Sequence, residues 1–176
     1  MAVTVLNGGF AAWQQAGLPI ETEVMPPQPR TFTLHTNAAQ VATTAELERA
    51  VRDGALANGS PVLVDARAAD RFAGENETID PVAGHIPSAR NHPFARNVDP
   101  EGRFLPAAEL RERWTATLGA AAAHPAQVIA MCGSGVTACH NLLALEIAGF
   151  PGARLYAGSW SEWIRDPARP VTRGGS

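Results

Sequence analysis

The chain has 176 residues, of which 45% are hydrophobic and 18% are charged, a length that suits one sizeable buried core and is short for two. Its net charge of −3, with 14 basic residues scattered along the chain, argues against a nucleic-acid partner, because no basic tract could neutralise a phosphate backbone. No apolar run approaches the roughly 20 residues that a membrane-spanning helix needs, so the sequence predicts no membrane partner either.

The two ends of the chain carry the same pattern of glycine, tryptophan and proline. Gly8 and Trp13 match Gly158 and Trp163, each pair 150 positions apart, and a proline follows each tryptophan a few residues later. This likeness predicts a repeat, in which residues 1–20 are the last strand and helix of a preceding domain.

A proline-rich linker is expected next, over residues 21–37, because proline fixes φ and favours an extended connector. The main domain is then expected over residues 38–176. Its first element is a short amphipathic helix, since Thr43 and Glu46 have the spacing of a capping box and Gly54 ends the pattern.

Strands and helices alternate through the rest of the main domain. Compact apolar runs predict buried strands over residues 61–65 and 127–131, with a further strand over 154–157. Helical spacing of apolar residues predicts helices over 105–118 and 138–148. The alternation indicates an α/β domain with a mostly parallel central sheet flanked by helices, and its ligand site is expected beyond the carboxyl ends of the strands.

Cys132 lies where that site is expected, between an apolar strand and a helix. Gly133 and Gly135 allow the loop that follows to curl, so that several backbone N–H groups could face one point. The amino-terminal end of the next helix adds positive potential there. A thiolate is stabilised by the same field, so the sequence predicts that Cys132 is a nucleophile.

Several motifs in this order resemble one known family. They are residues 64–67 (VDAR), 71–72 (RF), 84–91 (GHIPSARN), 132–138 (CGSGVTA) and 156–163 (YAGSWSEW). Together they resemble the sulfurtransferases of the rhodanese superfamily, with the cysteine loop in the form found in 3-mercaptopyruvate sulfurtransferases. The resemblance implies a rhodanese-like three-layer domain, preceded in the full-length protein by an inactive first rhodanese-like domain.

The resemblance also implies a ping-pong reaction at Cys132. The thiolate takes a sulfane sulfur from a small anionic donor, and the persulfide passes it to cyanide, a thiol or a thioredoxin-like protein. No metal or organic cofactor is implied. Arg71 matches the arginine that holds the anionic end of the donor, and a guanidinium suits such a group. The implied anion cradle is the backbone of Gly133, Ser134, Gly135, Val136 and Thr137.

The identity of the donor stays open between 3-mercaptopyruvate and thiosulfate. Thiosulfate-preferring relatives carry Arg and Lys after the cysteine, whereas Gly133 and Ser134 stand here, which favours mercaptopyruvate. Mercaptopyruvate enzymes usually carry a second arginine where this chain has Asp80, which argues the other way. In mercaptopyruvate enzymes, a serine at the Ser134 position is linked to proton handling, together with a His and an Asp from the first domain. The alternative is that Ser134 only caps the loop and that Thr137 caps the start of the helix.

Two other classes of protein share features with this site. Cysteine phosphatases place a similar loop between strand and helix, but they end it with an arginine six positions after the cysteine, where this chain has Ala138. A noncatalytic rhodanese-like module that binds partners is the second alternative. The retained Cys132 in an intact loop argues against that module.

The remaining chemically capable side chains are expected to be structural, namely Asp65, Arg67, His85, Trp160 and Trp163. Cys139 falls on the apolar helix, and its spacing from Cys132 is not that of a zinc ligand set, so we expect it to pack in the interior. Two cysteines cannot form a disulfide framework, and they favour a reducing, cytoplasmic setting.

Overall fold

A parallel sheet forms the centre of the molecule. The computed structural model describes residues 3–29, 31 and 33–175. Within this part, the four strands lie in the order β2-β1-β3-β4, and all three pairings are parallel. Their bounds are β1 Val62–Asp65, β2 Arg90–Asn91, β3 Val128–Met131 and β4 Arg154–Leu155.

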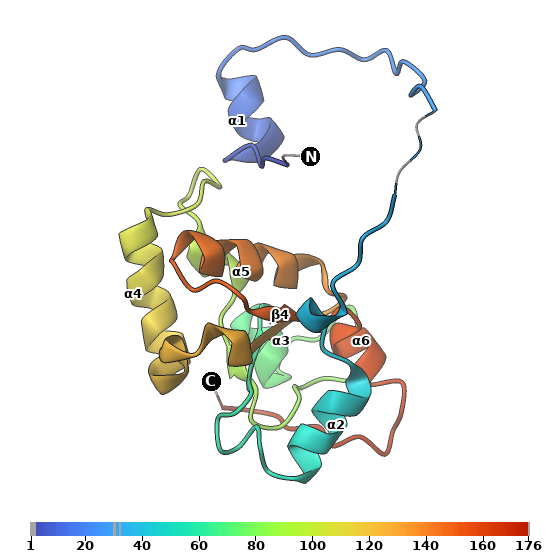
Figure 1. Cartoon of the computed structure of the whole chain (residues 1–176), viewed down its shortest axis with the longest axis vertical. Helices are drawn as coiled ribbons and strands as arrows, with labels where there is room; N and C mark the ends of the chain where they lie inside the picture. Colours follow the sequence, from blue (N-terminus) through green and yellow to red (C-terminus); the bar gives the residue numbers. More distant parts are fainter. Residues whose placement is uncertain (1–2, 30, 32, 176) are drawn as a thin grey trace.

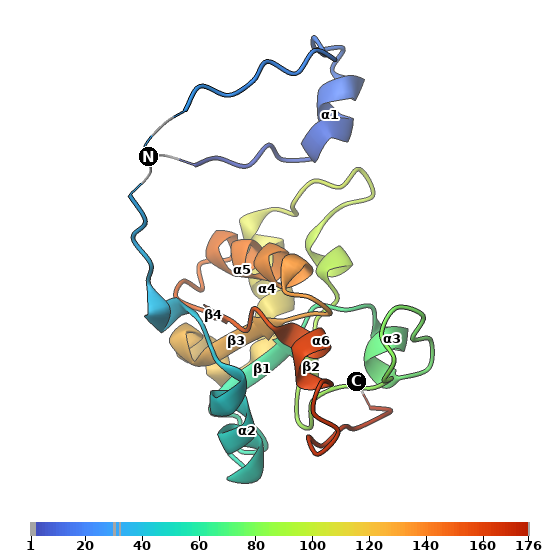
Figure 2. The same cartoon turned by 90° about the vertical axis from the view of Figure 1, so that its right-hand side faces the viewer.

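Helices cover both faces of this sheet (Figures 1 and 2). The α-helices are α1 Gly9–Gln15, α2 Thr44–Arg52, α3 Ala69–Ala73, α4 Ala107–Leu118, α5 Val136–Ile147 and α6 Ser159–Trp163. Short 3₁₀ helices span Ala38–Gln40, Phe94–Asn97, Gly119–Ala123 and Pro125–Gln127. Figure 2 shows α4 and α5 on one side of the sheet and α2 and α6 on the other.

Alternate side chains of the strands enter two separate parts of the core. In β1, Leu63 packs with Leu47 of α2 and Trp163 of α6, whereas Val64 packs with Trp114 of α4. Because successive side chains of a strand point to opposite faces, a fully apolar strand must be covered twice. The expected α/β three-layer architecture with a parallel central sheet is therefore confirmed.

Most of the expected elements are present within a residue or two. Thr43 is the N-cap of α2, and its hydroxyl accepts a hydrogen bond from the backbone N–H of Glu46 at 3.2 Å, as the capping pattern predicts. The edge strand β2 and the five-residue helix α3 were not predicted. Both are too short to carry a periodic pattern, and β2 is a strand because it pairs with β1 in register Val64 to Arg90.

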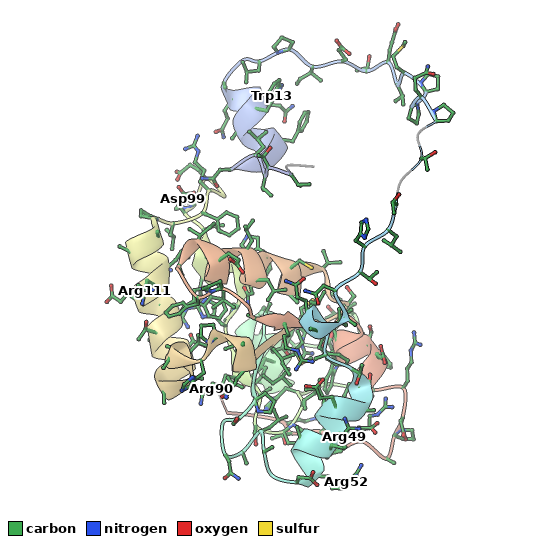
Figure 3. All side chains as sticks on the ribbon, in the orientation of Figure 1. Trp13, Arg49, Arg52, Arg90, Asp99 and Arg111 are labelled. Carbon is green, nitrogen blue, oxygen red and sulfur yellow. The ribbon has the colours of Figure 1, made fainter. Side chains whose placement is uncertain are left out.

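Two arginines hold the carboxyl ends of the long helices and are labelled in Figure 3. The Nη1 of Arg90 donates to the carbonyls of Thr117 and Leu118 at the end of α4, at 2.9 and 2.7 Å. Nη1 of Arg111 donates to the carbonyl of Ala148 at the end of α5, at 3.1 Å. These cations satisfy terminal carbonyls and oppose the negative end of the helix dipole.

A buried polar network lies beneath α4 and α5. The ring of His92 stacks on Trp114 with centroids 3.8 Å apart, and His92 Nε2 lies 3.1 Å from Asn97 Oδ1. That oxygen also accepts from the indole N–H of Trp114, and Asn97 donates to Asn141 at 2.7 Å. An amide oxygen can only accept, so Nε2 of His92 carries the proton and Nδ1 accepts from the Thr117 hydroxyl at 2.7 Å.

Residues 3–20 lie outside the layers that surround the sheet, as Figure 1 shows. The repeat predicts a strand before α1, but Val3–Leu6 form none, because a strand needs a partner and no described strand pairs with them. The helix itself is present. The indole of Trp13 donates to the carbonyl of Pro19 at 2.9 Å, the same contact that Trp163 makes with Pro170 at 3.0 Å. The division into 1–20, 21–37 and 38–176 stays a prediction.

One loop of the main body reaches this segment. The side-chain oxygen of Asn7 accepts from the backbone N–H of Phe104 at 2.8 Å. Asp99, labelled in Figure 3 with Trp13, shapes this loop by accepting from the N–H of Arg103 at 2.8 Å.

Candidate active site

Cys132 directly follows β3, at the carboxyl edge of the sheet. Its backbone is fixed from both sides by the chain that follows β4. The N–H of Cys132 donates to the hydroxyl of Ser159 at 3.1 Å, and its carbonyl accepts from the N–H of Trp160 at 3.0 Å. Ser159 in turn donates to the carbonyl of Tyr156 at 2.9 Å. The cysteine backbone therefore has one defined position before any ligand binds.

Gly135 brings a backbone N–H to the cysteine sulfur. This N–H donates to Cys132 Sγ at 3.1 Å, and Gly135 is the N-cap of the 12-residue helix α5. Its φ is +86°, and a Cβ at this position would lie 2.5 Å from the carbonyl oxygen of Ala157. Only glycine fits both the conformation and the space. The sulfur thus lies at the positive end of a helix and receives one directed amide.

The other loop residues occupy the positions that the sequence predicts, with two differences. Ser134 and Val136 are exposed, and Gly133 and Thr137 are half-buried. Thr137 does not cap α5, because the helix begins at Val136, its N-cap is Gly135, and its N-terminus has no side-chain cap. Only the Gly135 amide contacts the sulfur among the described residues, whereas the sequence predicts several converging amides.

A cavity of about 310 Å³ opens at the cysteine. Cys132 has 2% of its surface exposed and lies in the cavity wall with the loop after it. The opposite wall comes from the segment after β1. The side chains that line the cavity as a whole include Arg67, Arg71, Ile79, Asp80, Phe94 and Ser161. The thiol is therefore shielded from bulk solvent but reachable by a small molecule.

Arg71 lines this cavity, and two carboxylates hold its guanidinium. Nε and Nη2 both donate to Glu77 at 2.9 to 3.2 Å, and Nη2 also donates to Asp80 at 3.0 Å. A methyl group added to Gly133 would lie 3.9 Å from both terminal nitrogens of Arg71. The arginine therefore faces the cysteine loop, and its Nη1 has no hydrogen-bond partner among the described residues.

Glu77 is the centre of this ionic arrangement. Burial raises the pKa of Glu77, but hydrogen bonds from Arg71 and from the backbone N–H groups of Asp80 and Ile79 outweigh it and leave the pKa below its usual value. The carboxylate is thus ionised at neutral pH and holds residues 77–80 against α3. Neither Glu77 nor Asp80 was predicted as a partner of Arg71; their separations of six and nine residues from Arg71 match no helical pairing.

The side chains expected to be structural are all buried and make contacts within the fold. Nη2 of Arg67 donates to the Asp65 carboxylate at 2.8 Å and to the Gly84 carbonyl at 2.7 Å. The two charged groups are therefore buried as a pair. His85 Nδ1 lies 2.9 Å from the carbonyl of Phe72, on whose ring it stacks. Trp160 and Trp163 are fully buried.

The expectation for Cys139 was wrong. Its side chain is exposed, and the thiol donates to the Gly135 carbonyl at 3.4 Å. Position 139 falls on the solvent side of α5, since Ala138 and Asn141 form the buried side. Because α5 is apolar around most of its circumference, its sequence does not indicate which face packs against the core.

Sequence reasoning missed the part played by Ser159. Its φ is +53°, unusual for a residue with a side chain, and its fully buried hydroxyl bonds to the cysteine backbone. A serine between Gly158 and Trp160 gives no signal of this contact, because the partner is 27 positions away.

In residues 3–29, 31 and 33–175, no group of three or more His, Cys, Asp or Glu side chains is arranged to hold a metal ion. None of the helices in that part of the chain is both long and apolar enough to cross a membrane.

The fold and the site define an α/β domain that presents one cysteine on a glycine-bearing loop at the carboxyl edge of a parallel sheet. Residues 43–166 match the family model of the rhodanese-like domain. The chain is 48% identical over 172 residues to a probable 3-mercaptopyruvate sulfurtransferase of Pseudomonas aeruginosa, covering 98% of this chain and 58% of that protein. The chain therefore belongs to the rhodanese-like domain family.

Other relatives extend this comparison. A putative thiosulfate sulfurtransferase of Mycobacterium tuberculosis is 41% identical over 175 residues, covering 98% of this chain and 58% of that protein. The crystal structure of Tum1 from Saccharomyces cerevisiae superposes with a TM-score of 0.79 at 25% identity, over 96% of this chain and 60% of that one. The chain thus spans a little over half the length of the curated relatives it matches.

Proposed function

We propose that the protein is a sulfurtransferase that carries sulfur as a persulfide on Cys132. The observation that supports this most directly is the Gly135 N–H on the cysteine sulfur at the head of α5. An amide and a helix terminus directed at one sulfur stabilise an anion there, whether a thiolate or a persulfide. The names of the similar proteins from Pseudomonas and Mycobacterium agree with this chemistry.

Two half-reactions make up the proposed cycle. The Cys132 thiolate attacks the transferable sulfur of the donor, the bond from that sulfur to the rest of the donor breaks, and pyruvate or sulfite leaves. When mercaptopyruvate is the donor, the proton of its own thiol group moves to the carbon that loses the sulfur, which gives pyruvate. A thiol or cyanide then attacks the outer sulfur, and the electron pair of the broken S–S bond returns to Cys132.

The site residues have distinct roles in this proposal. The backbone of residues 133–137 cradles the outer sulfur, and Nη1 of Arg71 meets the anionic end of the donor. 3-Mercaptopyruvate is the proposed donor and thiosulfate the alternative, since the relatives carry both names. No metal or organic cofactor takes part in the proposed cycle. The proposal places the protein in the cytoplasm, where reducing conditions keep both cysteines as thiols.

A noncatalytic binding module is the alternative of another class, and turnover separates the two. With cyanide as acceptor, we expect thiocyanate to form from mercaptopyruvate, from thiosulfate or from both, and Cys132→Ser to abolish it. Cys139→Ser is the matched control, because this exposed thiol lies outside the cavity lining, and it is expected to retain turnover. Turnover that persists in Cys132→Ser would contradict the proposal, and a folded wild-type protein inactive with both donors would favour the binding module.

A further inference from the structure

A chain of ion pairs supports the cavity wall opposite the cysteine loop, and among the described residues it includes both of the arginines and the one carboxylate that line the cavity there. Asp65 pairs with Arg67 at 2.8 Å, and Arg67 lies 3.5 Å from Glu77. Glu77 pairs with Arg71 at 2.9 Å, and Arg71 pairs with Asp80 at 3.0 Å. This ionic chain holds three carboxylates and two guanidinium groups, so its net charge is −1.

Asp80 is the carboxylate of this chain that faces the cavity. Its side chain is 12% exposed and lines the cavity with Cys132, whereas those of Asp65 and Glu77 are 0% and 2% exposed and do not. The Nε and Nη2 of Arg71 are already bonded to carboxylates. An anion that approaches Nη1 therefore enters the field of an adjacent, partly solvated negative charge.

We propose that Asp80 is a specificity-determining residue of the sulfur-passing step, which raises the rate for acceptor thiols that carry a cationic group near the sulfur, of the aminothiol class, relative to anionic acceptor thiols. The inference rests on the proposed function. Inside a half-enclosed cavity, water and salt screen charges less than on an open surface. The Asp80 carboxylate therefore attracts an ammonium group and repels a carboxylate or a sulfonate-like group.

The sulfur-passing step shows where this preference acts. The acceptor thiolate attacks the outer sulfur of the Cys132 persulfide, a new S–S bond forms, and the old bond breaks with its electron pair on Cys132. The acceptor leaves as a persulfide. An ammonium group two carbons from the attacking sulfur takes no part in the bonds that change. It pairs with Asp80 during approach, so Asp80 alters the rate through charge alone.

Three thiols of similar size and different charge test this preference. Enzyme loaded with persulfide and freed of donor is mixed with cysteamine, 2-mercaptoethanol or mercaptoacetate, and the second-order rate of sulfur loss is measured. For each thiol, the rate of Asp80→Asn is divided by that of wild type, so intrinsic thiol reactivity cancels. We expect about a fivefold fall for cysteamine, no change for 2-mercaptoethanol and about a fivefold rise for mercaptoacetate.

Glu75→Gln is the matched control, because it removes one negative charge from an exposed position of the same loop outside the cavity lining. Its three ratios are expected to be equal, and the Asp80 effect is expected to shrink in 0.5 M salt. Asparagine can still accept the Arg71 hydrogen bond, and matching thermal unfolding curves verify the fold. Equal ratios in Asp80→Asn, or the same pattern in Glu75→Gln, would overturn this inference alone. If neither donor loads Cys132, the proposed function fails and the inference fails with it.

Discussion

Replacing Gly135 with alanine is expected to lower the rate of persulfide formation at least a hundredfold and to destabilise the fold. The new Cβ would lie 2.5 Å from the Ala157 carbonyl oxygen, and φ is +86°, where a side chain is strained by about 1 to 3 kcal/mol. The backbone must move, which displaces the N–H that donates to Cys132 Sγ. Losing one directed donor to a reacting anion typically costs about a hundredfold or more in rate.

Gly133→Ala provides the comparison for stability. The added methyl group meets its nearest neighbours at 3.9 Å, an ordinary contact, and Gly133 has no positive φ. Its free energy of unfolding in urea is expected to stay within about 0.5 kcal/mol of wild type, as for most tolerated substitutions. If Gly135→Ala unfolds at the same urea concentration as Gly133→Ala, the proposed steric requirement at Gly135 is wrong.

Acid is expected to weaken the fold through His92. Burial, reinforced by the charges of Arg96 and Arg113, lowers the pKa of His92 from 6.5 to about 4. Between these values the unfolded chain binds a proton that the folded protein does not. The contribution of His92 is therefore complete above pH 6.5, falls as the pH drops, and is lost below about pH 4. The shift corresponds to about 3 kcal/mol.

Urea unfolding at pH 7 and at pH 4.5 measures this loss. Other groups also titrate in this range, so the loss of unfolding free energy in wild type is compared with the loss in His92→Gln. This substitution removes the titrating ring and keeps an N–H donor. The variant is expected to lose about 2 to 3 kcal/mol less than wild type over this interval. His124→Gln, at an exposed histidine, is expected to follow wild type. Equal losses in His92→Gln and wild type would contradict the account of the buried network.

The sequence predicts those parts of the fold that depend on neighbours along the chain. The capping pair Thr43 and Glu46 lies within one turn, and the apolar runs of β1 and β3 are continuous, so propensity and periodicity suffice. The edge strand β2 has two residues and exists through its pairing with β1. Short elements of this kind depend on tertiary contacts that no local pattern records.

The same division holds at the candidate site. The position of Cys132, between strand and helix, follows from a local pattern, and so does the expectation that glycines let the next loop curl. The hydroxyl of Ser159 on the cysteine backbone and the two carboxylates on Arg71 were not predicted. These contacts join separate loops, and their geometry depends on how the segment after β1 and the segment after β4 fold over the edge of the sheet.

Mass spectrometry of the peptide that carries Cys132 tests the central claim most directly. The protein is incubated with mercaptopyruvate or thiosulfate, freed of donor and digested without reductant. We predict a mass gain of one sulfur atom on Cys132, absent in Cys132→Ser, retained in Cys139→Ser and reversed by cyanide. A gain located on Cys139, or one that survives Cys132→Ser, would contradict the account.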